Sequence, residues 1–192
     1  MLPLLLDAID LVRLRVRPLE AYQYPGWQPI LVLALLGVAA SADAPELGNN
    51  LLGRTAFLML FTLVEMAGLV VFLRLWLRLA GVELRQSLFG LAVAASGLQL
   101  LEPLTSWLPD NLAAAAGLLL GLGSIAVLVN ALSGVSGVPR LRVFAGVMLY
   151  ALLAVLMLSM SLSVADGLGW ITLPPDWLPA QGASSAGSAS AI

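Results

Sequence analysis

Residues 55–77 read TAFLMLFTLVEMAGLVVFLRLWL, and this run decides what kind of fold the chain can adopt. Glu65 and Arg74 are its only charged residues. About 20 predominantly apolar residues in an α-helix, each rising 1.5 Å, cross the roughly 30 Å hydrocarbon core of a bilayer. The run therefore predicts a helix that spans a membrane.

The composition of the whole chain agrees with this prediction. Apolar residues make up 60% of the 192 residues, charged residues make up 10%, and the mean hydropathy is +0.99. An ordinary soluble domain is about 45–50% apolar and about 25% charged. Because a folded chain of this size still shows much of its surface to solvent, this excess indicates that lipid is the main solvent.

Further apolar runs accompany the first, separated by segments rich in proline, glycine and asparagine. A bilayer admits a spanning segment only as a helix or as part of a closed barrel, and runs of this length predict helices. We therefore expect an all-α fold, a polytopic transmembrane bundle of five helices within residues 27–170. The predicted spans are residues 27–42, 55–77, 88–108, 112–132 and 143–164.

Residues 1–26 predict an interfacial amphipathic helix, not a cleavable signal peptide, because the apolar residues precede the arginines. The apolar side chains recur at helical spacing, at Leu5, Ile9, Val12 and Val16. The charged side chains fall on the opposite side, at Asp7, Asp10, Arg13 and Arg17. Such a helix lies in the headgroup layer, where Arg13, Arg15 and Arg17 meet anionic lipid. Residues 171–192 are predicted to be a disordered extracytoplasmic tail, because the chain ends in the glycine-, alanine- and serine-rich stretch AQGASSAGSASAI.

The arginines predict the topology. Five crossings bring three arginine-bearing segments to one side, and these hold eight of the nine basic residues: Arg13, Arg15, Arg17, Arg74, Arg78, Arg85, Arg140 and Arg142. Arg54 falls on the other side. Cytoplasmic loops carry the excess of positive charge. We therefore expect a multi-pass protein of the bacterial inner membrane, with a cytoplasmic N-terminus and a C-terminus outside.

Glu65 is the most informative single residue, because a carboxylate near the middle of a span usually faces a protein interior or water. One hypothesis is a proton or cation relay. The other is a protonated or hydrogen-bonded glutamate that holds helices together through Ser96, Gln99 or Asn130. Glu65, Gln99 and Asn130 are the candidate intramembrane polar site.

The fourth predicted span carries Gly117-x-x-x-Gly121, a spacing that lets two helices approach closely. Packing against another helix of the same chain is the first interpretation, and a homodimer seam is the alternative.

The inventory of ionisable residues argues against catalysis. The chain has no histidine, cysteine or lysine, so the usual general bases, thiolate nucleophiles and sulfur or imidazole metal ligands are all missing. We expect no enzyme activity, no cofactor and no metal site. The net charge of −2 and the absence of a basic cluster argue against a nucleic-acid partner. The expected partners are the lipid bilayer and other membrane proteins or a second copy of the chain.

The layout resembles bacterial members of the Ypt-interacting protein (YIP) family, which are five-span membrane proteins. Three segments carry the resemblance: RLRVRPLEAYQYPGWQP at residues 13–29, LAGVELRQSLFGLAVAAS at 79–96, and LVNALSGVSGVPRLRVFAGVMLYAL at 128–152. The resemblance implies a non-enzymatic scaffold, assembly or trafficking-like role, because eukaryotic members are tied to small GTPases and vesicle traffic. The N-terminal region of about 26 residues is shorter than in many of those members. The alternative hypothesis is a subunit of a transporter or channel that uses Glu65.

Overall fold

A computed structural model describes residues 2–84, 86–105, 107–174 and 177. Every regular element in that part of the chain is helical. The longer helices are α2 (Trp27–Ala42), α3 (Leu51–Leu79), α6 (Asp110–Ser136) and α7 (Arg140–Gly167). The shorter elements are α1 (Leu2–Val12), α4 (Phe89–Ala95), α5 (Glu102–Thr105) and the 3₁₀ helices η1 (Leu19–Tyr22), η2 (Pro45–Leu47) and η3 (Ser96–Leu101).

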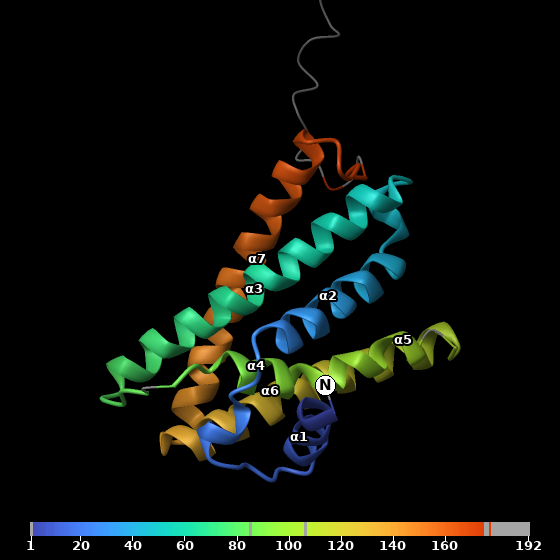
Figure 1. Cartoon of the computed structure of the whole chain (residues 1–192). Helices are drawn as coiled ribbons and strands as arrows, with labels where there is room; N and C mark the ends of the chain where they lie inside the picture. The colour runs from blue at the N-terminus through green and yellow to red at the C-terminus, as the bar shows by residue number, and fades with distance from the viewer. Residues whose placement is uncertain (1, 85, 106, 175–176, 178–192) are drawn as a thin grey trace, which may run out of the picture.

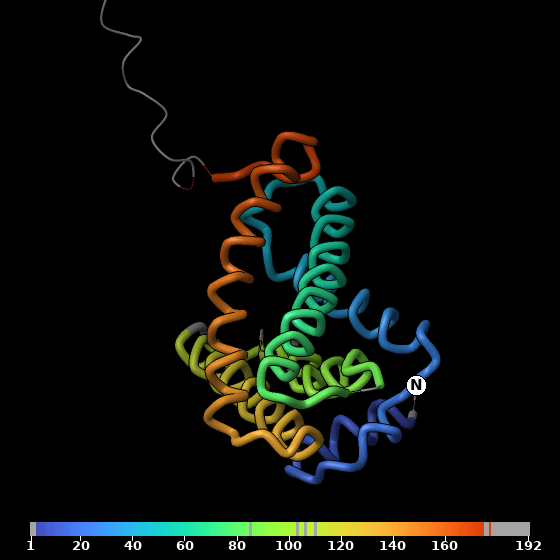
Figure 2. The backbone as a smooth tube through the Cα atoms, turned by 90° about the vertical axis from the view of Figure 1, so that its left-hand side faces the viewer, coloured from blue at the N-terminus to red at the C-terminus, as the bar shows by residue number. Residues whose placement is uncertain are grey.

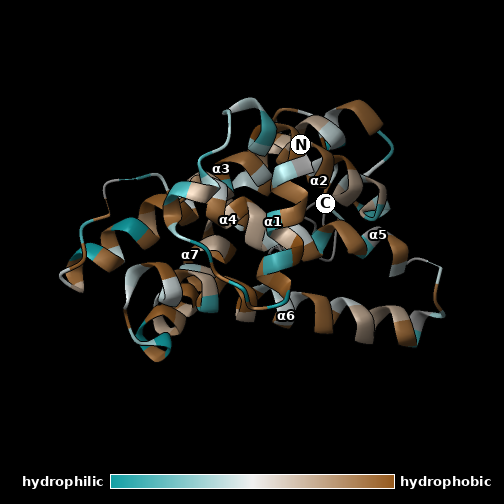
Figure 3. Ribbon diagram, turned by 60° about the horizontal axis from the view of Figure 1, so that its bottom comes forward, coloured by the Kyte–Doolittle hydropathy of each residue, from teal (hydrophilic) through white to brown (hydrophobic). Residues whose placement is uncertain are grey.

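The all-helical class is confirmed in the described residues. Helices α3, α6 and α7 are long and apolar enough to cross a membrane, which is compatible with the predicted membrane protein. Their 29, 27 and 28 residues correspond to about 43, 40 and 42 Å at 1.5 Å per residue. At most 22% of each apolar window is buried inside the protein, so most of these side chains face outward. Figure 3 shows apolar colours along most of α6. Exposed apolar surface of this extent suits contact with lipid tails.

The run at residues 88–108 differs from the single helix expected there. It forms α4, then the 3₁₀ helix η3, then the single turn α5. Three local features explain the break. The Ser96 hydroxyl donates to the carbonyl of Val93 (2.9 Å), residue 97 is a poor helix former, and residue 103 is a proline with no N–H to donate.

The helices form two groups, called arms below, which are in contact at one end and diverge toward the other. One arm contains α2, α3 and α7, and the other contains the α4–η3–α5 segment with α6 (Figure 1). The view in Figure 2 shows α3 and α7 standing upright above α4 and α6. The arms meet where α3 and α6 end and α7 begins, and they diverge toward the last residues of α2 and α5.

The largest apolar core lies where the arms meet. Helices α3, α4, α6 and α7 each contribute fully buried side chains to it. These are Leu73 and Leu77 of α3, Leu91 of α4, Leu132 of α6 and Val143 of α7. The diverging ends of the arms have no core of this size in the described residues.

A smaller core joins η2, α3, the end of α7 and the segment after α7, at the other end of α3 and α7. It contains Leu47, Phe57, Ala165 and Ile171, and Ile171 is only 1% exposed. The backbone N–H of Thr172 donates to the carbonyl of Leu47 (2.9 Å). The prediction of disorder from residue 171 onward is therefore wrong at its start, because these contacts order residues 171–174. The rest of the predicted tail lies outside the described residues except for Trp177.

Helix α1 buries the side that carries Asp7. Leu4, Ala8 and Leu11 are buried against α4, η3 and α6, together with Asp7, which is 4% exposed. Leu5, Ile9 and Val12 are exposed together on the other side of the helix. Asp7 can be buried because Arg17 and Tyr24, which come later in the chain, bind its carboxylate.

Candidate intramembrane polar site

Glu65 lies halfway along α3, which has 14 residues on each side of it. Its side chain is half-buried, and no described residue makes a hydrogen bond or an ion pair with its carboxylate. The backbone carbonyl of Glu65 accepts a hydrogen bond from the Tyr150 hydroxyl of α7 (2.5 Å). That bond holds α3 and α7 together at the height of the carboxylate.

Glu65 lines a cavity of about 360 Å³ between the two arms. The break at Ser96 contributes to its wall, because it brings Ser96 and Gln99 to the same space as Glu65. Most of the lining is apolar. The polar lining residues are Thr62, Glu65, Ser96, Gln99, Ser124 and Tyr150.

The hydroxyl of Ser124 has no hydrogen-bond partner in the described part of the chain, although the residue is only 7% exposed. The Thr62 and Ser96 hydroxyls, in contrast, donate to backbone carbonyls about one turn earlier in the chain. A buried polar group without a partner costs about 1–3 kcal/mol. A cavity that contains such a group is therefore suited to a water molecule or a polar ligand.

A second hollow of about 310 Å³ adjoins the first. The two share Leu36, Thr62, Glu65 and Gln99 as lining residues. The second also reaches Asp43, which follows α2, and Glu102, which begins α5. Both of these carboxylates are exposed. Spacing along the sequence does not bring these two carboxylates together, because their approach depends on how the arms diverge.

The third residue of the candidate site lies elsewhere. Asn130 is half-buried on α6 but does not line either hollow. The structure thus brings Glu65 and Gln99 together, adds Ser124, Thr62 and Tyr150, and leaves Asn130 out.

The glycine pair of α6 does not pack within the chain as first interpreted. A methyl group added at Gly117 or at Gly121 would meet nothing within 4 Å in the described structure. Gly121 borders the cavity around Glu65. The neighbouring Leu118 and Leu119 are exposed, because this half of α6 lies on the diverging arm. The homodimer alternative therefore stays open.

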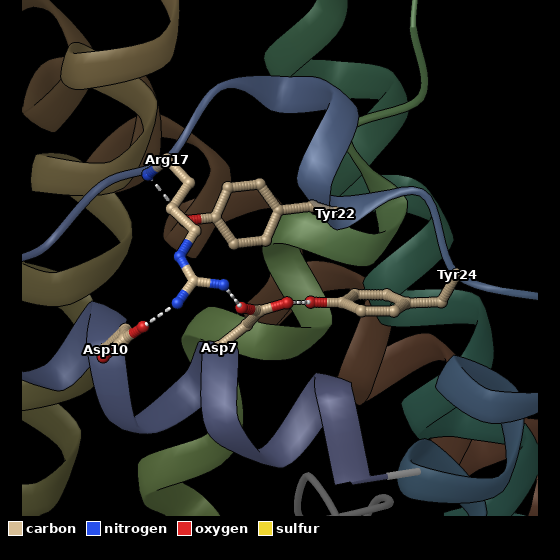
Figure 4. A network of polar contacts seen from close by, with 5 residues as sticks. All are labelled: Asp7, Asp10, Arg17, Tyr22 and Tyr24. Carbon is tan, nitrogen blue, oxygen red and sulfur yellow. Dashed lines mark hydrogen bonds and ion pairs between the residues drawn. The ribbon is translucent and has the colours of Figure 1, made fainter.

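A second polar cluster anchors the N-terminal segment (Figure 4). The Arg17 guanidinium donates to Asp7 (2.8 Å) and to Asp10 (2.5 Å). The Tyr24 hydroxyl donates to the other oxygen of Asp7 (2.6 Å), and the Arg17 backbone N–H donates to the Tyr22 hydroxyl (3.0 Å). Arg17 was predicted to contact lipid headgroups, but its guanidinium instead pairs two carboxylates of α1.

This cluster requires the chain to turn back after α1. Leu14 adopts a left-handed backbone conformation (φ 59°), and α1 ends at Val12 instead of continuing to Val16. Burial, followed by the hydrogen bond and the charge of Asp7, raises the pKa of Tyr24 above its ordinary value of 10.0. Burial also raises the pKa of Tyr22. Both phenols therefore stay neutral hydrogen-bonding groups at physiological pH.

Three of the remaining arginines, Arg74, Arg78 and Arg142, lie at the end where the arms meet. Arg74 donates to the carbonyl of Leu84, and Arg142 donates to that of Leu79, both at 3.2 Å. Arg78 lies 3.7 Å from Glu83 in an exposed ion pair. Three more are exposed, namely Arg13, Arg15 and Arg140. Arg85 lies outside the described residues, and Arg54 is at the opposite end of α3.

The oxygen set around Glu65 limits what the cavity can hold. One carboxylate with neutral hydroxyl and amide oxygens suits a monovalent cation or an ammonium group better than a divalent metal ion, which prefers several carboxylates. In the described residues, no group of three or more histidine, cysteine or acidic side chains could hold a metal ion.

No family model matches the chain, and no match was found among curated proteins or solved structures.

Proposed function

We propose that the protein is a membrane transporter or channel subunit that admits a small cation to Glu65. The observation that carries this proposal is the 360 Å³ cavity in which the Glu65 carboxylate has no partner among the described residues. A purely structural glutamate in a dry helix junction would be bonded to a neighbouring helix. A carboxylate at mid-membrane costs at least about 2.5 kcal/mol, so such a residue is retained where it serves a path or a partner.

The proposed setting is the bacterial inner membrane. In this proposal α3, α6 and α7 cross the bilayer fully, and α2 with the α4–η3–α5 segment completes the five crossings. The N-terminus is cytoplasmic and the C-terminus is outside, as the arginine distribution favours. The role is non-enzymatic, because the chain lacks the usual bases and nucleophiles.

A second candidate function is a scaffold of the YIP type that acts through association with itself or other membrane proteins. The exposed half of α6, with open space around Gly117 and Gly121, favours it. Close approach of two helices through small residues is a common mode of membrane association. The test is to purify the protein in mild detergent and determine its mass with and without Gly117→Ile. A monomeric wild-type protein that retains no partner would contradict this candidate.

Ion flux into proteoliposomes tests the preferred function. The protein, with any partner that it retains, is reconstituted and given a sodium or proton gradient, and flux is followed with an ion-sensitive dye. We expect flux above that of empty liposomes, and loss of most of it in Glu65→Gln. Glu46→Gln is the matched control, because this exposed acid lies in η2 and lines neither hollow. Equal flux in wild-type protein and a folded Glu65→Gln variant would refute the proposal.

A further inference from the structure

The two hollows around Glu65 have different ends. Toward Asp43 and Glu102 the walls diverge, and both carboxylates at that end are exposed to solvent. Toward the arginine-bearing end, the helices close on one another. There Leu73 and Leu91 are no more than 1% exposed, and Val127 is also buried.

Between these ends, polar groups follow one another inward. Gln99 and Thr62 line both hollows, next to Glu65 itself. Beyond them lies the buried Ser124 hydroxyl, which has no hydrogen-bond partner in the described residues. An unpaired hydroxyl at the inner end of an acidic opening indicates that this space holds water or a ligand, because a dry site would leave the hydroxyl unsatisfied.

We infer that the two hollows form one aqueous vestibule, open at Asp43 and Glu102 and closed behind Glu65, through which small cations reach Glu65 from the extracytoplasmic side. The role of Glu65 in this inference rests on the proposed function. At about 30 Å³ per liquid water molecule, 360 Å³ leaves room for a hydrated monovalent ion or a small organic ammonium ion. Negatively charged carboxylates at the mouth of a low-dielectric cleft attract cations and repel anions.

The natural absence of cysteine makes this vestibule directly testable. A single Gln99→Cys substitution introduces one thiol beside Glu65 without removing any other. Intact cells or right-side-out vesicles are treated with two membrane-impermeant thiosulfonate reagents of similar size, one carrying a trimethylammonium group and the other a sulfonate. Thr62→Cys serves as a second probe of the same space, and it carries the test if Gln99→Cys does not fold.

Two control positions bracket the result. Asn49→Cys, in the exposed turn before α3, reacts with both reagents. Leu118→Cys, on the exposed apolar face of α6, reacts with neither, because it faces hydrocarbon. Folding of each variant is checked by gel filtration in detergent.

We expect the thiol at residue 99 to react from outside about tenfold faster with the cationic reagent than with the anionic one at low salt. The combined substitutions Asp43→Asn and Glu102→Gln bring that ratio close to one, as does high salt. Reaction only in inverted vesicles, equal rates with the two reagents, or no reaction at either probe in a folded protein would overturn the inference.

The labelling experiment and the flux experiment fail independently. Labelling needs only water at residue 99, so the vestibule stands if the reconstituted protein carries no ion. Flux that depends on Glu65 in a protein whose probes are closed to outside reagents refutes the vestibule and leaves the proposed function intact.

Discussion

Replacing Tyr24 by phenylalanine tests whether the Asp7 cluster holds α1 against the bundle. The substitution removes one hydroxyl and keeps the ring. That hydroxyl donates to the Asp7 carboxylate at 2.6 Å, and Asp7 is 4% exposed. A hydrogen bond to a charged group contributes about 1.5–3 kcal/mol, and its loss leaves one carboxylate oxygen without a donor inside the protein.

Loss of about 1.5–3 kcal/mol would raise the equilibrium constant for detachment of α1 from the bundle by a factor of about 10 to 150. Hydrogen exchange followed by mass spectrometry in lipid nanodiscs measures that equilibrium, because local opening exposes the amides of the segment that detaches. We expect faster exchange in residues 2–12 and little change in α7. Tyr22→Phe is the matched control, since it removes a neutral bond worth about 0.5–1.5 kcal/mol and should have a smaller effect.

A double-mutant cycle sharpens the result. Asp7→Asn and Tyr24→Phe remove two ends of the same bond, so their effects on exchange should not add. Unchanged exchange of α1 in a folded Tyr24→Phe protein would show that the cluster does not anchor the helix, and the account of the buried Asp7 would be wrong.

Three further predictions concern packing, pH and the cavity. Gly37→Ala should lower the thermal stability by about 1–3 kcal/mol, because the added Cβ would lie 2.5 Å from the Met59 Cα; Gly26→Ala, where the added atom meets nothing within 4 Å, should change it far less in the same melting experiment. Tyr22 and Tyr24 have pKa values raised above 10.0 in the folded protein, so unfolding releases protons at alkaline pH. The contribution of the two neutral phenols to the free energy of unfolding is therefore complete below pH 10 and declines above it. Ultraviolet titration of the phenols and melting experiments at increasing pH should both show this decline. Ser124→Ala should leave the ligand-free melting temperature unchanged or slightly higher, because it removes an unpaired buried hydroxyl. It should also reduce the rise in melting temperature that added sodium or ammonium salt produces. An unchanged rise would argue against a cation contact at this hydroxyl.

The long helices could be predicted from the sequence because their cause is local. Residues 55–77, 112–132 and 143–164 lie inside α3, α6 and α7, which the structure extends by a few residues at each end. An unbroken apolar run of this length forms a helix wherever lipid surrounds it. The presence of Glu65 near the middle of its span was equally readable from its position.

The break in the third run and the pairing of Asp7 could not be predicted in this way. The composition of residues 88–108 is apolar whether or not the helix continues. Gly97 and Pro103 are visible in the sequence, but apolar spans tolerate both residues, and the bond from Ser96 to its own backbone is seen only in the structure. Asp7 and Arg17 look like parts of one charged face until the chain reverses at Leu14. Only the tertiary arrangement then shows that Asp7 is buried and that the opposite, apolar face of α1 is exposed.

The cavity required the same tertiary information. Gln99 is close to Glu65 because η3 and α3 lie on different arms that face each other, and Asn130 is excluded because it lies further along α6, toward the closed end. Sequence spacing gives the polar residues that a membrane interior could contain, but not which of them share a space.

The sidedness of the helices is the claim on which the vestibule and the cation pathway both depend, and one topology map tests it most directly. Paired alkaline phosphatase and fluorescent-protein fusions are placed after residues 46, 82 and 137, in the connections around α3 and before α7. We predict that position 46 reports the outside and that positions 82 and 137 report the cytoplasm. Positions 46 and 82 reporting the same side would mean that α3 does not cross the membrane, and the assignment of Glu65 to its interior would then be wrong.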